Sequence, residues 1–235
     1  MEPEQRIALV RSIFSRVVPR YDLFNHVVSL YRDKFWRRAA AARAKVFHTG
    51  RILDLATGTG DLALALAERF PRALVVGADF MYPMLERAGT KTRRRGRDEQ
   101  ILLAGADALA LPFPDHTFDS VTIAFGIRNI PNLKQAFSEM RRLLAPGGRL
   151  VVLEMSFPRW SSMRRLYHVY LNRVVPKLGA LFSGHALAYQ YLADSIMDFP
   201  EPEELSEQMT RNGFVKAQFI KLTFGVAAIH WGEVQ

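Results

Sequence analysis

An α/β fold, with a mostly parallel seven-stranded sheet and helices on both faces, is predicted by three features of the sequence. From Arg51 to Met155, short β-branched or leucine-rich runs alternate with helical stretches, which favours right-handed βαβ crossovers. A glycine turn, GTG, follows the first apolar run. Two closing runs, FVKAQFIKL and GVAAIHWG, meet at Thr223-Phe224-Gly225 and predict an antiparallel hairpin at the sheet edge.

The period of the apolar residues predicts the position of each element. Five strands are expected at Ile52–Ala56, Leu74–Ala78, Ile101–Ala104, Ser120–Phe125 and Arg149–Met155. The helices between them are expected at Asp61–Phe70, Tyr82–Lys91 and Leu133–Leu144. Helical periodicity also covers residues 4–18, 22–47, 161–175, 185–198 and 202–212. We expect a polar connection at GTKTRRRGRDEQ, which contains Arg93, Arg94, Arg95 and Arg97.

Composition restricts the class of protein. The chain contains no cysteine, which excludes disulfides, thiolate nucleophiles, cysteine-bound zinc and iron–sulfur clusters. The N-terminus opens with acidic residues and lacks a long apolar run, so no signal peptide is expected. No stretch approaches the roughly 20 apolar residues of a membrane span, and we therefore expect a cytoplasmic protein. The net charge of +9 favours an anionic partner, either nucleic acid or a membrane surface.

The glycine turn predicts a ligand site at the end of the first strand. Gly58, Gly60 and Ala63 form a G-x-G-x-x-A pattern, in which glycines let the backbone approach a ligand closely. Asp79 ends the second strand, 19 residues after Gly60, where its carboxylate can accept both hydroxyls of a ribose. This pattern alone is equally compatible with a dinucleotide such as NAD.

Asp54 favours a cationic ligand over a dinucleotide. A carboxylate just before the turn would repel a pyrophosphate bound at the helix N-terminus, whereas it suits an ammonium or a sulfonium. The alternative is that Asp54 only accepts hydrogen bonds from turn amides. Asp107 and Ala108, after the third strand, offer a carboxylate for an exocyclic amino group and a small neighbour for an adenine ring. Together these residues favour S-adenosylmethionine as the ligand, and hence a methyltransferase.

Longer motifs identify the chain as similar to a known family. They are FSRVVPRYDLFN, ILDLATGTGDLA, LPFPDHTFDSVTIAFGIRN, LAPGGRLVVLEMS, YQYLADSIMDFP and LTFGVAAIHWG. With these motifs the chain resembles the ubiquinone/menaquinone biosynthesis C-methyltransferases, a branch of the class I S-adenosylmethionine-dependent methyltransferases. The FGIRN and YLADSI segments are far more specific to this family than the glycine turn. The resemblance runs from about Phe14 to the C-terminus.

The resemblance implies a Rossmann-like methyltransferase fold in one domain, residues 1–235. We expect a helical lid segment at 1–48, a cofactor-binding core at 51–155, a helical substrate cap at 156–200, and a closing helix and hairpin at 201–235. The family's contacts with S-adenosylmethionine carry over to Thr59, Asp79, Asp107 and Ala108. Ala124 stands where some members have a serine, which removes one possible cofactor contact.

Carbon methylation of a quinol ring is the activity that the resemblance implies. The most favoured acceptor is demethylmenaquinol, on the way to menaquinone, with the benzoquinol step of ubiquinone biosynthesis as the alternative. An aromatic carbon is a poor nucleophile until a neighbouring hydroxyl loses its proton, so a group that stabilises the phenolate is needed. Arg128 and Asn129, just after the fourth strand, are the candidates, together with Tyr21 from the polar YDLFNH segment. For Arg128 the alternative is a salt bridge that orients the loop. No histidine shows metal-ligand spacing, and no metal is expected.

The segment from Met155 to Ala193 contains no acidic residue. Its apolar positions fall on one helical stripe, which is typical of core packing, and Arg164, Arg165 and Arg173 add positive charge. A basic amphipathic cap would also let the enzyme dock on an anionic membrane that holds the polyprenyl substrate. A nucleic-acid methyltransferase is the rival hypothesis, but no N-P-P-Y-type tetrad or RNA-binding module is present, so no nucleic-acid partner is expected. A homodimer is possible.

Overall fold

The computed structural model describes residues 21–158, 160–178 and 186–235. These residues form a sheet with the order β3-β2-β1-β4-β5-β7-β6. Its strands are β1 Arg51–Leu55, β2 Leu74–Asp79, β3 Ile101–Gly105, β4 Phe118–Ala124, β5 Leu144–Met155, β6 Val215–Leu222 and β7 Ala227–Glu233. Strands β1 to β5 pair in parallel, and β7 pairs antiparallel with both β5 and β6. The predicted fold class and the closing hairpin are confirmed.

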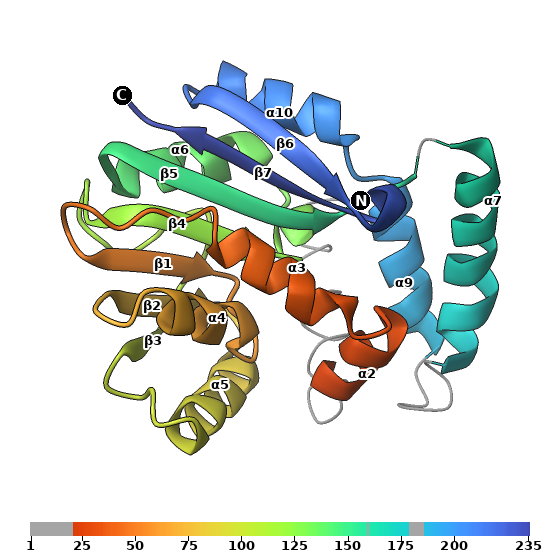
Figure 1. The fold of residues 1–235 in the computed structure, drawn as a ribbon, viewed down its shortest axis with the longest axis horizontal. Helices are drawn as coiled ribbons and strands as arrows, with labels where there is room; N and C mark the ends of the chain where they lie inside the picture. The colour runs from red at the N-terminus through yellow and green to blue at the C-terminus, as the bar shows by residue number, and fades with distance from the viewer. Residues whose placement is uncertain (1–20, 159, 179–185) are drawn as a thin grey trace.

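Helices cover both faces of this sheet (Figure 1). On one face, α6 Leu133–Leu143 and α10 Pro202–Arg211 pack through Phe137, Met140 and Leu205. On the other, α3 Arg32–Ala41 and α4 Asp61–Arg69 pack through Trp36 and Leu66. Strand β5 contributes alternate residues to the two sides, as the period of two in a strand requires. α5 Tyr82–Arg94 packs against the edge strand β3 and its neighbour β2.

Several predicted boundaries were wrong, and the helix expected at 22–47 is two helices, which end at Val28 and Ala41. Arg93 and Arg94 belong to the last turn of α5 and not to the connection, because basic side chains favour helix C-termini and Thr92 continues the buried stripe. Strand β5 begins at Leu144, five residues before the predicted Arg149. Leu144 still pairs with Phe118, across an irregularity in the register. The predicted helix at 4–18 lies outside the described residues.

The order of the strands reverses between β1 and β4, since β2 and β3 extend to one side of β1 and β5 to the other. Open α/β sheets bind ligands at the carboxyl ends of the strands at such a point. The helix pair, α2 Tyr21–Val28 and α3, lies at this end, together with α7 Ser161–Val169, η3 Tyr170–Val174 and α9 Ala186–Met197 (Figure 1). Among the described residues, no helix is long and apolar enough to cross a membrane.

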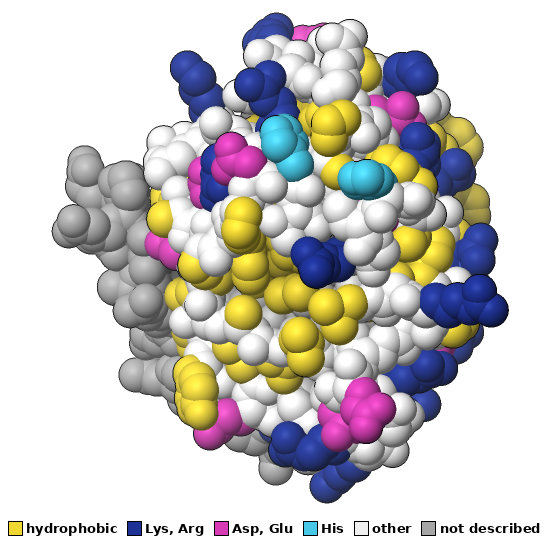
Figure 2. Space-filling view, turned by 90° about the vertical axis from the view of Figure 1, so that its left-hand side faces the viewer, with side chains coloured by type: hydrophobic (Ala, Val, Ile, Leu, Met, Phe, Trp, Pro, Cys, Tyr) yellow, Lys and Arg dark blue, Asp and Glu magenta, His cyan; other side chains and the backbone are white. Residues whose placement is uncertain are grey.

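Figure 2 shows the opposite end of the sheet, where the parallel strands begin. Hydrophobic side chains gather in the middle of this face, and Lys and Arg side chains lie mostly around its edge. The positive charge of the chain is therefore not confined to the end that carries the helices.

Candidate functional site

The glycine turn joins β1 to α4 with a backbone that favours glycine. Gly58 and Gly60 have φ angles of 57° and 85°, in the left-handed region. A Cβ atom on Gly60 would lie 3.3 Å from the Cβ of Ala88, so this glycine lets α5 pack against the start of α4. A Cβ atom on Gly58 would meet nothing within 4 Å, which leaves open space beside the turn. Gly60 thus shapes the turn, while Gly58 faces a cavity.

Asp79 anchors this turn from the end of β2. Its Oδ2 accepts a hydrogen bond from the Gly58 amide at 2.8 Å, and its Oδ1 accepts one from the Met81 amide at 2.8 Å. Burial raises the pKa of the Asp79 carboxyl, and these amide bonds oppose that effect. A carboxylate offers about four acceptor positions, so both oxygens can still accept a hydroxyl from a ligand.

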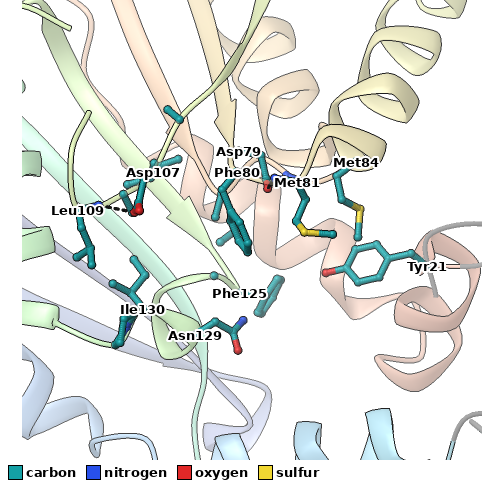
Figure 3. A pocket seen from close by; sticks show the side chains of 18 residues that line it. Tyr21, Asp79, Phe80, Met81, Met84, Asp107, Leu109, Phe125, Asn129 and Ile130 are labelled. Carbon is teal, nitrogen blue, oxygen red and sulfur yellow. Dashed lines mark hydrogen bonds between the residues drawn. The ribbon is translucent and has the colours of Figure 1, made fainter. Parts of the chain in front are cut away.

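A cavity of about 120 Å³, the first cavity, opens between these strand ends (Figure 3). Asp79 and Asp107 project into it from the ends of β2 and β3, and Ala108 lies beside Asp107. The Asp107 carboxylate accepts a hydrogen bond from the Leu109 amide at 2.9 Å. Apolar side chains form the remaining walls: Leu55, Phe80, Met81, Met84, Leu109, Phe125 and Ile130. The cavity therefore offers two carboxylates among mostly apolar walls.

Asp54 lies beside the first cavity in a small polar recess, which Gly58 and Thr59 also line. It is 1% exposed, and it accepts hydrogen bonds from the Thr57 and Thr122 hydroxyls at 2.6 and 3.1 Å. Burial raises the pKa of the Asp54 carboxyl to about 7, and these two hydroxyls oppose the rise. A cation bound in the recess would favour the ionised form of this side chain.

A second cavity, of about 440 Å³, lies between the helix pair and helices α7, η3 and α9. Its walls are mostly apolar and include Val28, Leu30, Trp36, Met155, Met163, Leu166, Leu171, Leu192, Ile196 and Val226. Tyr21 and Phe125 line both cavities, so the two spaces adjoin at these rings. Figure 3 shows Tyr21 approaching from α2. Two molecules, one bound in each cavity, would contact each other at this junction.

Arg128 lines the second cavity and forms a buried ion pair with Glu154. Its guanidinium also donates to the Phe125 carbonyl at 2.9 Å. Glu154, in β5, is 1% exposed and accepts a further hydrogen bond from the Met155 amide at 2.8 Å. The loop-orienting salt bridge, which was the alternative for Arg128, is therefore present, and the same side chain reaches the cavity wall.

Asn129 lies in the wall of the first cavity and accepts a hydrogen bond from the Tyr191 hydroxyl at 2.9 Å. Asn129 belongs to the FGIRN segment and Tyr191 to YLADSI. The two segments most typical of the resembled family thus meet in space, although 62 residues separate these two positions.

Tyr167, an apolar-stripe residue of the acid-free segment from Met155 to Ala193, lines the second cavity. It is 6% exposed, and its hydroxyl has no hydrogen-bond partner among the described residues. A buried hydroxyl without a partner is costly, so a polar group of a bound molecule would stabilise it. The stripe itself is divided: Leu171 is buried, whereas Trp160 is 70% exposed.

Thr59 does not line the first cavity but connects the turn to the helix pair. It donates to Asp22 at 2.5 Å and accepts from Lys91 at 3.0 Å. Lys91 also forms ion pairs with Asp22 and Asp61, both at 2.7 Å. Helix α2 is thereby attached to α4 and α5. This network could not be predicted, because its members are far apart in the chain.

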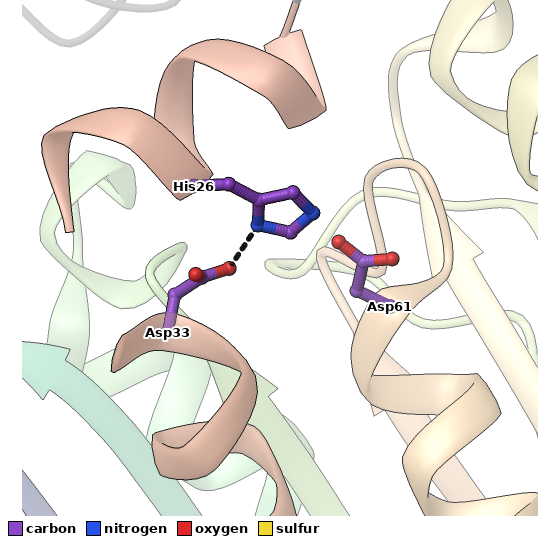
Figure 4. A group of neighbouring side chains, drawn as sticks. All are labelled: His26, Asp33 and Asp61. Carbon is purple, nitrogen blue, oxygen red and sulfur yellow. Dashed lines mark hydrogen bonds and ion pairs between the residues drawn. The ribbon is translucent and has the colours of Figure 1, made fainter. Parts of the chain in front are cut away.

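His26, Asp33 and Asp61 form the group in the described part of the chain that most resembles a metal site (Figure 4). Their ligand atoms lie within 4.8 Å of one another. However, Arg37 pairs with Asp33 at 2.6 Å and Lys91 with Asp61 at 2.7 Å. Because two cations already balance the two carboxylates, we assign no metal to this group.

Known proteins resemble the chain over nearly its whole length. The model of the ubiE/COQ5 methyltransferase family matches residues 2–234. A demethylmenaquinone methyltransferase of Thermus thermophilus is 53% identical over 94% of this chain and 99% of its own. A protein of Geotalea daltonii named ubiquinone/menaquinone biosynthesis C-methyltransferase UbiE is 42% identical, with 95% of each chain covered.

Solved structures share the fold at lower identity. A Thermotoga maritima S-adenosylmethionine-dependent methyltransferase, a possible histamine N-methyltransferase, has a TM-score of 0.66 and 21% identity over 95% of this chain and 99% of its own. A Haemonchus contortus phosphoethanolamine N-methyltransferase, in complex with S-adenosyl-L-methionine, has a TM-score of 0.57 over 80% of this chain and 38% of its own. The predicted class of enzyme and its cofactor, S-adenosylmethionine, are confirmed. The chain belongs to the ubiE/COQ5 methyltransferase family.

Proposed function

We propose that this protein transfers a methyl group from S-adenosylmethionine to a ring carbon of a polyprenylated quinol, with demethylmenaquinol as the acceptor. The observation that carries the proposal is the pair of adjoining cavities, one with carboxylates at strand ends and one large and apolar, that share Tyr21 and Phe125. The name of the Thermus relative supports the choice of acceptor. The name of the Geotalea relative also favours a benzoquinol, which is the second candidate.

The first cavity and the polar recess fit S-adenosylmethionine, which supplies a methyl group on a sulfonium. Asp79 would accept the ribose hydroxyls, and Asp107 with Ala108 would hold the adenine. The methionine end would lie beside Asp54, Gly58 and Thr59, with Gly60 fixing the turn. The buried Asp54 carboxylate is the observation that favours this fit, because it can balance a positive ligand where a pyrophosphate would be repelled.

In this proposal, Tyr21, Arg128 and Asn129 handle the acceptor. Burial raises the pKa of the Tyr21 phenol, while the nearby charges of Arg37 and Arg128 oppose this, so Tyr21 is a neutral hydrogen-bond donor at pH 7. A hydrogen bond from Tyr21 and the positive charge of Arg128 would stabilise a phenolate on the quinol ring. Methyl transfer would need the acceptor carbon close to the sulfonium and in line with its methyl group, and Tyr21 and Phe125 would hold the two molecules against each other at the junction of the cavities.

The helices around the second cavity would act as the lid and cap, and they would also meet the membrane. Trp160 and Leu166 are 70% and 64% exposed on α7 or next to it, and Arg164 and Arg165 are exposed beside them. Such a surface favours anionic headgroups, with the polyprenyl tail entering the apolar cavity from the bilayer. The homodimer stays a prediction.

The experiment that tests the proposal offers the purified protein radiolabelled S-adenosylmethionine with three acceptors in parallel. These are demethylmenaquinol, a polyprenyl benzoquinol without the ring methyl group, and total RNA. We expect label in the naphthoquinol first and in the benzoquinol second. Label in RNA alone would contradict the proposal, and label in the benzoquinol alone would replace the acceptor by the second candidate.

A further inference from the structure

The polar recess beside the glycine turn has an uneven charge. Two carboxylates, Asp54 and Asp61, line it, together with hydroxyls and backbone. Arg37 is the one cationic side chain among the described residues that line it. An amino-acid end such as that of methionine carries both an ammonium and a carboxylate, and the carboxylate would be repelled by Asp54 and Asp61 unless a cation lies beside it.

Arg37 reaches this recess from α3, a helix outside the strand-and-turn framework. Its side chain is 11% exposed, and its NH1 donates to Asp33 at 2.6 Å. The guanidinium carbon lies 5.0 Å from the centre of the Phe125 ring, which lines both cavities. Arg37 also lines the second cavity. A guanidinium has five N–H donors, and the bond to Asp33 leaves several of them for a ligand.

We propose that Arg37 is the counter-ion of the methionine carboxylate of S-adenosylmethionine. This inference deepens the proposed function and rests on it, and it assigns the role to a residue that the sequence did not single out. An arginine binds a carboxylate with strong, charge-assisted hydrogen bonds. Because α3 supplies the arginine, cofactor binding would hold the helix pair in position over the site. It would also order the part of the second cavity's wall that Arg37 forms.

The other cations near the site are less suited to this role. Lys91 does not line the recess, and its ammonium forms ion pairs with two carboxylates, whereas Arg37, among the described residues, forms one, with Asp33. Arg128 lines the second cavity but not the recess, and it pairs with the buried Glu154. The Arg37 charge opposes the rise that burial causes in the pKa of the Asp54 carboxyl, and it helps to lower the pKa of the Asp61 carboxyl, as expected for a cation near both.

The test compares two ligands that differ only in the carboxylate, S-adenosylhomocysteine and its decarboxylated analogue, by calorimetry. The wild type should prefer S-adenosylhomocysteine by about tenfold or more, the size of a charge-assisted hydrogen bond. In Arg37→Gln the ratio of the two affinities should fall to about one, and Arg37→Lys should keep part of the preference. Arg38→Gln removes the same charge from an exposed position on the same helix and should keep the full preference.

Three results would overturn the inference. If Arg37→Gln lowers the affinity for both ligands equally, and a melting curve shows that the variant is folded, Arg37 only holds the helix pair in place. If the preference is unchanged, amides at the start of α4 bind the carboxylate instead. If the wild type binds neither nucleoside, the proposed function itself is wrong, and the inference with it.

Discussion

Different interactions hold the polar side chains of the first cavity and those of the second cavity in position. In the first, backbone amides fix the functional carboxylates, as the Gly58 and Met81 amides fix Asp79 at the end of β2. In the second, ion pairs between distant segments position the polar groups, as Glu154 in β5 does for Arg128 after β4. The framework of the sheet thus defines the proposed cofactor end of the site, and side-chain pairs define the proposed acceptor end.

This difference predicts what substitutions will do at each end. A change in the first cavity should remove contacts with the cofactor while the sheet stays intact. A change in the second should also cost stability, because removing one member of a buried ion pair leaves the other charge without compensation. The following experiments are ordered from the largest expected effect to the smallest.

Arg128→Ala should lower the free energy of unfolding by about 3–5 kcal/mol, since Glu154 remains buried without its ion-pair partner. The double variant Arg128→Ala with Glu154→Ala should lose less than the sum of the two single changes. Urea unfolding of the three variants measures this. Additive losses would mean that the pair does not act as a unit. At temperatures where Arg128→Ala is folded, the methyl-transfer rate should fall more than cofactor affinity.

Asp79→Ala should weaken S-adenosylmethionine binding by about 1.5–3 kcal/mol for each ribose hydrogen bond that is lost. Calorimetry measures the affinity. The melting temperature should change less than in Arg128→Ala, because amides at a turn can be solvated by water. Unchanged affinity would exclude Asp79 from the cofactor site.

Because of Asp54, both the stability of the protein and its affinity for the cofactor should depend on pH. Its pKa is about 7 in the folded protein, above the usual value of 3.8, so the ionised form destabilises the fold. Stability from this group should be lost as pH rises from about 4 to about 7, and affinity for a cationic cofactor should rise over the same range. Asp54→Asn should remove both trends, and it should melt higher than the wild type at pH 8, by about 2–4 °C per kcal/mol gained.

Melting curves and cofactor titrations at pH 5 and pH 8 test this prediction. If the affinity of the wild type is the same at both pH values, Asp54 does not face the cofactor. If Asp54→Asn is less stable than the wild type at pH 8, the hydrogen bonds from the threonines outweigh the effect of burial.

Arg164→Glu with Arg165→Glu should weaken binding to anionic vesicles, since each exposed basic side chain near such a surface contributes roughly 1 kcal/mol. The matched control is Arg94→Glu with Arg95→Glu, which reverses the same charge on exposed residues at the end of α5. Co-sedimentation should fall for the first pair only. Equal losses would indicate that net charge, and not the α7 surface, governs binding.

The two cavities also differ in how far the sequence predicts them. Asp79 and Asp107 could be placed because each comes at or just after a strand end, and neighbouring parallel strands end at one sheet edge. The partner of Arg128 could not be predicted, because Glu154 is 26 residues away inside an apolar strand and only the fold brings the two together. The positions of Arg37 and Tyr167 in the wall of the second cavity were missed for the same reason, since their surroundings come from helices far apart in the chain.

The measurement that tests the central claim most directly is mass spectrometry of the quinones in a host that lacks its own quinol C-methyltransferase and carries this gene. The account predicts that demethylmenaquinone disappears and that menaquinone, heavier by one ring methyl group, takes its place. A gene that encodes the Asp79→Ala variant should restore less menaquinone. Demethylmenaquinone that persists unchanged, although the protein is present and binds S-adenosylmethionine, would contradict the account.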